Sequence, residues 1–130
     1  MLFRSGGSSS GTGTAANFWA ANVGSETSGS ILSPSNQNML AGIKPTVGRI
    51  SRYGVIPITA DQDTAGPMAR SVRDAAVLLT ALAAPDPGDP ATGARPDRAI
   101  DYASNLTSGG LRGKRIGVLR SYREIGRAHV

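Results

Sequence analysis

The stretch Gly24-Ser-Glu-Thr-Ser-Gly-Ser-Ile31 has the serine and glycine pattern of a tight turn that carries a reactive serine. Glycine tolerates the backbone conformations that such a turn needs, so we expect Gly24 and Gly29 to bend the chain. Successive backbone N–H groups in a turn can face a developing oxyanion, and Ser30 would lie at the tip as a nucleophile. The stretch therefore predicts a nucleophile and an oxyanion hole in one turn.

A second run, Gly6-Gly-Ser-Ser-Ser-Gly11, precedes the first. Between the two, residues 13–22 are rich in alanine and include Phe18 and Trp19, which predicts a buried helix with Trp19 in the core. A serine and glycine run alone is usually a flexible linker, but a linker does not continue into ordered blocks of Lys-Pro-Thr and Gly-Pro-Met.

These ordered blocks resemble the signature region of the amidase signature family, whose members hydrolyse carboxamides through a Ser-Ser-Lys triad. The resemblance covers about Gly6 to Arg120 and rests on both serine runs and on Gly42-Ile-Lys-Pro-Thr-Val-Gly-Arg49, Ser51-Arg-Tyr-Gly-Val-Ile-Pro57 and Asp63-Thr-Ala-Gly-Pro-Met-Ala-Arg-Ser71. Several blocks in a fixed order are far more specific than one motif. The resemblance implies an α/β fold, a mixed β-sheet core covered by helices, of which this chain is a fragment incomplete at both ends.

By position, Ser30 resembles the family's acyl-enzyme nucleophile, and Ser8 resembles the bridging serine, which in the family follows a cis peptide bond. Ser9 is expected to form hydrogen bonds beside the reacting groups without reacting. The family's oxyanion hole is matched by four successive backbone N–H groups, those of Thr27, Ser28, Gly29 and Ser30. The implied reaction is acyl transfer, in which Ser30 attacks the amide carbonyl, ammonia or an amine leaves, and water releases the acid.

The third member of the triad, a lysine, lies in the family on a strand well upstream of the first serine run, and this chain lacks it. Lys44 is expected to be structural, because Pro45 restricts it to an extended conformation. His129 is the only histidine, so a Ser-His-Asp triad has no suitable base. Two alternatives stay open: part of an active amidase that is inactive by itself, or a non-catalytic remnant or binding module with the amidase scaffold.

Two substitutions place the chain nearer the peptide-amidase-like branch than the branch of the glutamyl-tRNA amidotransferase A subunit. Ser28 stands where many members have glycine, and Leu32 where many have arginine. The interval between the serine runs is also about two residues shorter than usual, which would rotate a helix by more than half a turn. Either a loop absorbs this difference or Ser8 and Ser30 do not meet.

Short strands are expected at residues 47–50 and 55–58, where β-prone residues alternate with glycine and proline. Asp63 is expected to bind backbone N–H groups of a following Thr-Ala-Gly turn, with Arg70 as an ion-pair partner. Arg49 and Arg52 either line a pocket for an acidic substrate or are structural. A capping box at Ser71 and Asp74 predicts a helix that runs to Pro85.

Towards the C-terminus, the pattern predicts a shorter helix over residues 98–105 and a strand over residues 115–119.

Composition predicts a soluble protein with one small core, since 39% of the 130 residues are hydrophobic and 18% are charged. The net charge of +5 is spread along the chain, so we expect no nucleic-acid partner, and no apolar run is long enough to span a membrane. No metal or organic cofactor is expected, and the substrate would be a small-molecule or peptide amide. A cytoplasmic location is expected, with secretion of a longer parent and the oligomeric state left open.

The two ends resemble translated sequencing adapters. Glu124-Ile-Gly-Arg-Ala-His-Val130 back-translates to GAG ATC GGA AGA GCA CAC GTC, the start of a short-read adapter. Leu2-Phe-Arg-Ser5 back-translates to CTC TTC CGA TCT, the end of the opposite adapter. Coincidental matches at both ends, each in the correct orientation, are improbable. We therefore expect residues 1–5 and 124–130 to be adapter-derived and residues 6–123 to be a partial amidase signature domain.

Overall fold

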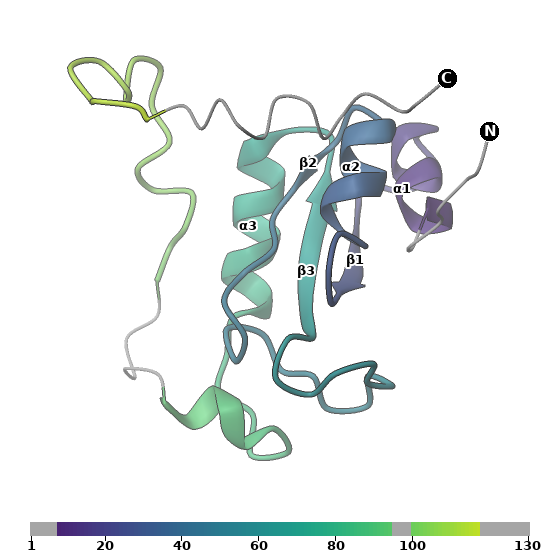
Figure 1. Cartoon of the computed structure of the whole chain (residues 1–130). Coiled ribbons are helices and arrows are strands. Elements are labelled where there is room, and N and C mark those ends of the chain that lie inside the picture. The colour runs from purple at the N-terminus through teal and green to yellow at the C-terminus, as the bar shows by residue number, and fades with distance from the viewer. Residues whose placement is uncertain (1–7, 95–99, 118–130) are drawn as a thin grey trace.

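The computed structural model describes residues 8–94 and 100–117, apart from the side chains of residues 8–10 and 94. Within them the chain forms a three-stranded sheet with helices, which confirms the expected α/β class (Figure 1). The elements in order are α1 (Ser8–Ala15), β1 (Ala21–Glu26), α2 (Leu32–Gln37), β2 (Ala41–Gly42), β3 (Thr64–Ala69), α3 (Val72–Leu82) and a short 3-10 helix, η1 (Pro90–Ala94).

Strand β3 is the centre of the sheet, which has the order β1-β3-β2 with both pairings antiparallel. Its register against β1 runs from Ala21 opposite Ala69 to Glu26 opposite Thr64, and every residue of β3 is buried. The turn predicted at residues 64–66 is therefore wrong, because this segment is the first half of the central strand.

Pro67 lies inside this central strand, although proline cannot donate a hydrogen bond to a ladder. The N–H of Ile43 donates to the Pro67 carbonyl at 3.0 Å, and the N–H and C=O of one strand residue point to the same side. The missing N–H of Pro67 thus faces the β2 side, where β2 has already ended at Gly42. The ladder between β1 and β3 loses no bond to this proline.

The two faces of the sheet pack differently. On one face, Ile31 at the start of α2 lies over glycines of the strands: a Cβ on Gly66 would meet Ile31 Cδ1 at 2.8 Å, and one on Gly24 would meet Ile31 Cγ1 at 3.3 Å. On the other face, α3 covers β3 through a cluster of Ile50, Ala65 and Leu79. Figure 1 shows α3 on one side of β3, with α1 and α2 on the other.

The expected buried helix over residues 13–22 is wrong. Helix α1 instead begins within the first serine run and ends at Ala15, and the chain then reverses through Asn17, whose φ is 65°. Trp19 is 45% exposed rather than in the core. Its indole lies against Gly13, and its Nε1–H donates to Thr14 Oγ1 at 2.7 Å.

The short strands expected at residues 47–50 and 55–58 are also absent from the structure, which has turns and irregular backbone there. The second segment buries too little to require a ladder, since Ile56 is 92% exposed, whereas the first turns at Gly48, whose φ is 80°, and contributes only Ile50 to the core. The described parts of the two C-terminal elements, residues 100–105 and 115–117, form turns and irregular backbone rather than a helix and a strand. Residues 98–99 and 118–119 lie outside the described residues.

Helix α3 begins as the capping box predicts. The N–H of Asp74 donates to Ser71 Oγ at 3.1 Å, the Ser71 hydroxyl donates to Asp74 Oδ2 at 2.7 Å, and Ser71 has the extended backbone of an N-cap. We expect Ser71→Ala to lower the free energy of unfolding by about 1 kcal/mol, because the Asp74 N–H loses its partner. Urea denaturation measures this loss, and an unchanged midpoint would show that the cap contributes nothing.

Candidate active site

The turn predicted to hold the nucleophile joins β1 to α2 over residues 27–31. Gly29 has a φ of 118°, a conformation that side chains with a Cβ rarely adopt, so the expectation for Gly29 is confirmed. Gly24 does not bend the chain: it lies within β1 opposite Gly66, so that expectation is wrong. Ser30 is half-buried at the end of this turn.

The buried carboxylate of Glu26 forms hydrogen bonds with the backbone at the end of this turn. Only 3% of Glu26 is exposed, and its Oε2 accepts hydrogen bonds from the N–H groups of Ile31 at 2.7 Å and Leu32 at 2.9 Å. Burial raises the pKa of the Glu26 carboxyl, but three backbone N–H groups and the Lys44 ammonium lower it more, so the pKa lies below its ordinary value. Glu26 thus satisfies the first N–H groups of α2, which has no side-chain cap of its own at Ile31.

Lys44 also contacts this turn. Its Nζ donates to the Thr27 carbonyl at 2.7 Å and lies 3.5 Å from Glu26 Oε1. An ammonium held by a carboxylate and a carbonyl is a structural cation, in agreement with the role expected for Lys44.

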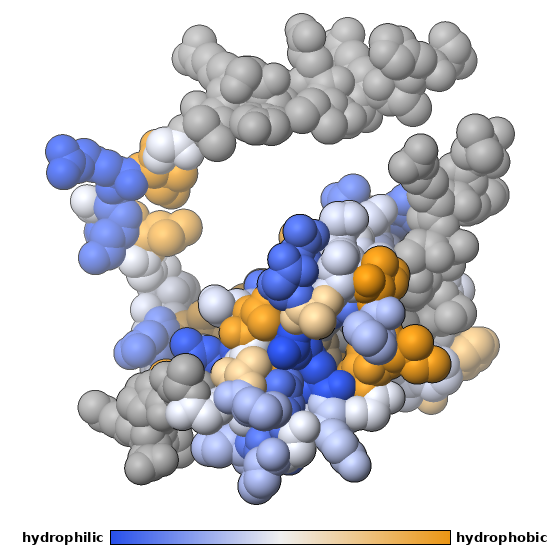
Figure 2. Space-filling view, turned by 60° about the horizontal axis from the view of Figure 1, so that its bottom comes forward, coloured by the Kyte–Doolittle hydropathy of each residue, from blue (hydrophilic) through white to orange (hydrophobic). Residues whose placement is uncertain are grey.

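Ser30 lines a cleft of about 410 Å³. One wall consists of β1 and the turn that follows it, and the other is the irregular segment containing Val55, Ile56 and Ile58. Figure 2 shows orange apolar residues beside blue hydrophilic ones on the face turned forward in that view. The cleft therefore places a hydroxyl beside apolar side chains, an arrangement typical of ligand pockets.

Asp63 joins the two walls of this cleft. Its Oδ2 accepts hydrogen bonds from the N–H groups of Ile58 at 2.7 Å and Thr59 at 3.1 Å, and its Oδ1 accepts one from the Thr27 hydroxyl. Asp63 does bind backbone N–H groups, as expected, but upstream ones. The Thr27 hydroxyl lowers the pKa of Asp63 below its ordinary value, and it does so more strongly than burial raises it.

Arg70 is not the partner of Asp63, so that expectation is wrong. Its Nη1 donates instead to the carbonyls of Thr14 and Trp19, each at 3.0 Å. Arg70 therefore ties the end of the central strand to the chain reversal after α1.

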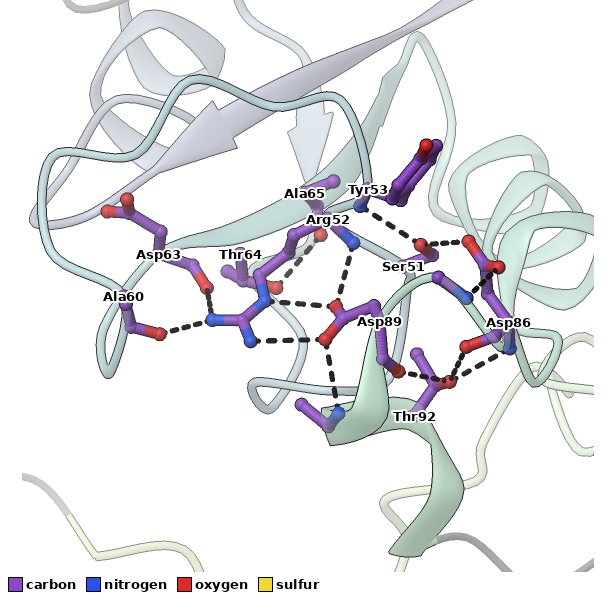
Figure 3. A network of polar contacts seen from close by, with 12 residues as sticks. Ser51, Arg52, Tyr53, Ala60, Asp63, Thr64, Ala65, Asp86, Asp89 and Thr92 are labelled. Atoms are coloured by element: carbon purple, nitrogen blue, oxygen red, sulfur yellow. Dashed lines mark hydrogen bonds and ion pairs between the residues drawn. The ribbon is translucent and has the colours of Figure 1, made fainter.

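Arg52 is the centre of a polar network beside the cleft (Figure 3). Its Nε donates to Asp89 Oδ2 at 3.1 Å, its Nη2 donates to Asp89 Oδ1 at 3.3 Å, and its backbone N–H donates to Asp89 Oδ2 at 2.9 Å. Its Nη1 donates to the carbonyls of Ala60 and Asp63. Of the two alternatives for Arg52, these contacts make it structural, although it also lines a hollow of about 290 Å³.

Asp89 contributes to the pH dependence of stability. The Arg52 guanidinium lowers the pKa of Asp89 to about 2, whereas an unfolded aspartate has a pKa of about 3.9. A carboxyl with a lowered folded-state pKa stabilises the fold above its unfolded pKa and loses this contribution as the pH falls through its folded pKa. Between about pH 4 and pH 2, wild type should therefore lose more stability than Asp89→Asn. Urea denaturation from pH 6 to 2 measures the difference, and parallel curves would contradict it.

The other predicted site residues lie at the edge of the described region. Ser8 and Ser9 begin α1, but their side chains and the peptide bond from Gly7 to Ser8 lie outside the described residues. The backbone of α1 approaches α2, where a Cβ on Gly11 would lie 3.5 Å from Pro34 Cβ. Whether Ser8 meets Ser30 therefore stays a prediction. His129 also lies outside the described residues.

Sequence reasoning missed three features of the site: the role of Glu26, the role of Asp89 and the partners of Asp63. Glu26 stands five residues before Ile31, and an acidic residue just upstream of a helix start is the available signal for its role. Asp89 bonds to Arg52 across 37 positions in a proline-rich connection, and no local pattern marks such a pair. Among the described residues, no group of histidine, cysteine or acidic side chains could hold a metal ion, and no helix has the length and apolarity to cross a bilayer.

Comparison with known proteins identifies the family. A family model described as Amidase matches residues 3–128. The chain belongs to the amidase signature family. This confirms the resemblance carried by the serine runs and the three later blocks.

Its similarity to individual amidases is close. A putative amidase of Arthroderma benhamiae is 50% identical over 122 residues, 92% of this chain and 21% of that protein. The solved peptide amidase of Stenotrophomonas maltophilia is 52% identical, with a TM-score of 0.75 over 81% of this chain and 22% of that one. The glutamyl-tRNA(Gln) amidotransferase A subunit of Cereibacter sphaeroides is 45% identical over 93% of this chain and 24% of that protein. The chain thus spans about a fifth to a quarter of the length of the amidases it matches.

Proposed function

We propose that this chain supplies the nucleophile and oxyanion hole of a longer amidase that hydrolyses a carboxamide C–N bond. The observation that supports this most directly is the position of Ser30, which follows a glycine at φ 118° and lines a cleft of about 410 Å³. Membership of the amidase signature family supports the same reaction class.

In the proposed reaction, Ser30 Oγ attacks the amide carbonyl and forms an acyl-enzyme, while the amine leaves with a proton. Ser8 relays the proton from Ser30 to a lysine in another part of the longer protein. The backbone N–H groups of residues 27–30 stabilise the oxyanion. The N–H of Gly29 also lies near the Glu26 carboxylate and helps to lower its pKa, so we expect the other three groups to contribute most.

Lys44 is not the base in this proposal. Its Nζ is engaged by the Thr27 carbonyl and the Glu26 carboxylate, and it supports the turn rather than Ser30. We therefore expect the 130-residue chain by itself to be inactive. The substrate is proposed to be a small-molecule or peptide amide, and identity to peptide amidase supports that class.

Fluorophosphonate labelling of the full-length protein tests this proposal. A competent site activates Ser30, so the wild type should be labelled and Ser30→Ala should not. The 130-residue chain alone should stay unlabelled. An unlabelled full-length protein would instead favour a non-catalytic amidase scaffold.

A further inference from the structure

We propose that Asp63 is a positioning residue, which fixes the nucleophile turn against the opposite wall of the cleft through the Thr27 hydroxyl. This inference rests on the proposed function of Ser30. In the proposed reaction, Asp63 neither donates a proton nor attacks a bond. Its effect on that reaction is exerted through Thr27.

The wall opposite the turn needs such a side chain. Val55, Ile56 and Ile58 belong to an irregular segment between β2 and β3, and no ladder of backbone hydrogen bonds holds it. Ile56 and Ile58 are 92% and 81% exposed, so burial holds them weakly. Besides the turn bond from the Val55 N–H to the Arg52 carbonyl at 2.9 Å, the segment is held by the N–H groups of Ile58 and Thr59, which both donate to Asp63.

Asp63 is held in place by the central strand that it precedes. It directly precedes Thr64, the first residue of the central strand, and only 6% of Asp63 is exposed. Thr64 pairs with Glu26, the residue that holds the nucleophile turn. Arg52 fixes the same stretch from outside through the carbonyls of Ala60 and Asp63 (Figure 3).

Both the carbonyl and the hydroxyl of Thr27 form hydrogen bonds. Its carbonyl accepts from Lys44 Nζ at 2.7 Å, and its hydroxyl donates to Asp63 Oδ1 across 36 positions of sequence. The N–H of Thr27 is the first of the proposed oxyanion donors. Because oxyanion stabilisation depends on donors that are fixed before reaction, loss of the hydroxyl bond should slow the reaction at Ser30.

The test measures the second-order rate constant for fluorophosphonate labelling of Ser30 in the full-length protein, since this reaction places a phosphoryl oxygen in the oxyanion hole. Thr27→Val replaces the hydroxyl with a methyl group, and we expect about a 10- to 100-fold slower reaction. Thr27→Ser, which restores the hydroxyl, should recover most of the rate. Thr46→Val is the matched control on an exposed threonine outside the cleft and should react like wild type.

Asp63→Ala, which removes the acceptor of the Thr27 hydroxyl bond, completes a double-mutant cycle. If the pair acts as one unit, Thr27→Val should slow the Asp63→Ala protein much less than it slows wild type. Melting temperatures, measured in parallel, should not follow the labelling rates if the role is positioning. Wild-type labelling rates in Thr27→Val, or strictly multiplicative effects, would overturn the inference while leaving the function of Ser30 intact. Failure of the wild type itself to be labelled would overturn both.

Discussion

Replacement of Ser30 by alanine should lower kcat for amide hydrolysis by the full-length protein by about 10⁴-fold or more. Without Oγ no acyl-enzyme forms, and the oxyanion donors alone support only slow attack by water. Because the substitution removes one half-buried oxygen from the end of a turn, stability should change little. Ammonia release from a panel of primary and peptide amides measures the loss.

Ser33→Ala is the matched control for this change. Ser33 is an exposed serine in α2, three residues beyond Ser30, and its hydroxyl accepts only a long hydrogen bond of 3.4 Å from Gln37 Nε2. Its activity should equal that of wild type. A Ser30→Ala protein that keeps more than a tenth of wild-type kcat would exclude Ser30 as the nucleophile.

Glu26→Ala should have the largest effect on stability, a loss of about 3 kcal/mol or more in the free energy of unfolding. The substitution leaves the N–H groups of Ile31 and Leu32 without an acceptor, and it removes the carboxylate beside Lys44. The expected loss is at the lower end for buried pairs, because Lys44 is 31% exposed and can turn to solvent. Urea or thermal denaturation of the full-length protein measures it.

Glu26→Gln separates shape from charge in the same experiment. The amide oxygen can still accept a hydrogen bond from one N–H group, so the loss should fall to about 1–2 kcal/mol. Equal losses for alanine and glutamine would show that charge alone matters. An alanine variant as stable as wild type would mean that Glu26 does not support the turn.

Local rules predicted the elements that local contacts create. The start of α3 depends on Ser71 and Asp74, three residues apart, and the capping box identified it. The conformation of Gly29 was likewise predictable, because a tight turn requires a residue without a Cβ. Family resemblance supplied the α/β class and the location of Ser30.

Long-range packing decided what those rules missed. Gly66 and Pro67 are typical of turns, yet they lie in the central strand. The Ile31 side chain occupies the space where a Cβ on residue 66 would lie. The ladder between β2 and β3 ends before the position where Pro67 lacks its N–H, so proline is tolerated there. Trp19 was expected in the core because residues 13–22 were predicted to form a buried helix, but the reversal at Asn17 places it against Gly13 with its indole N–H bonded to Thr14. No periodicity in the sequence encodes either contact.

At the candidate site, too, local contacts were predictable from the sequence and long-range contacts were not. Asp63 could be recognised as a residue that binds backbone N–H groups, but its partners lie upstream, in a segment with irregular backbone. Its bond to Thr27 spans 36 positions and depends on how β1 and β3 pair. A sequence pattern predicts the chemistry of such a side chain better than it predicts its partners.

The most direct measurement is to treat the full-length protein with a fluorophosphonate, digest it and identify the modified serine by mass spectrometry. We predict a single adduct on Ser30, in the peptide that contains residues 24–31, and none on Ser25, Ser28 or Ser33. An adduct on another serine, or none at all, would contradict the claim that this turn carries the nucleophile of an amidase.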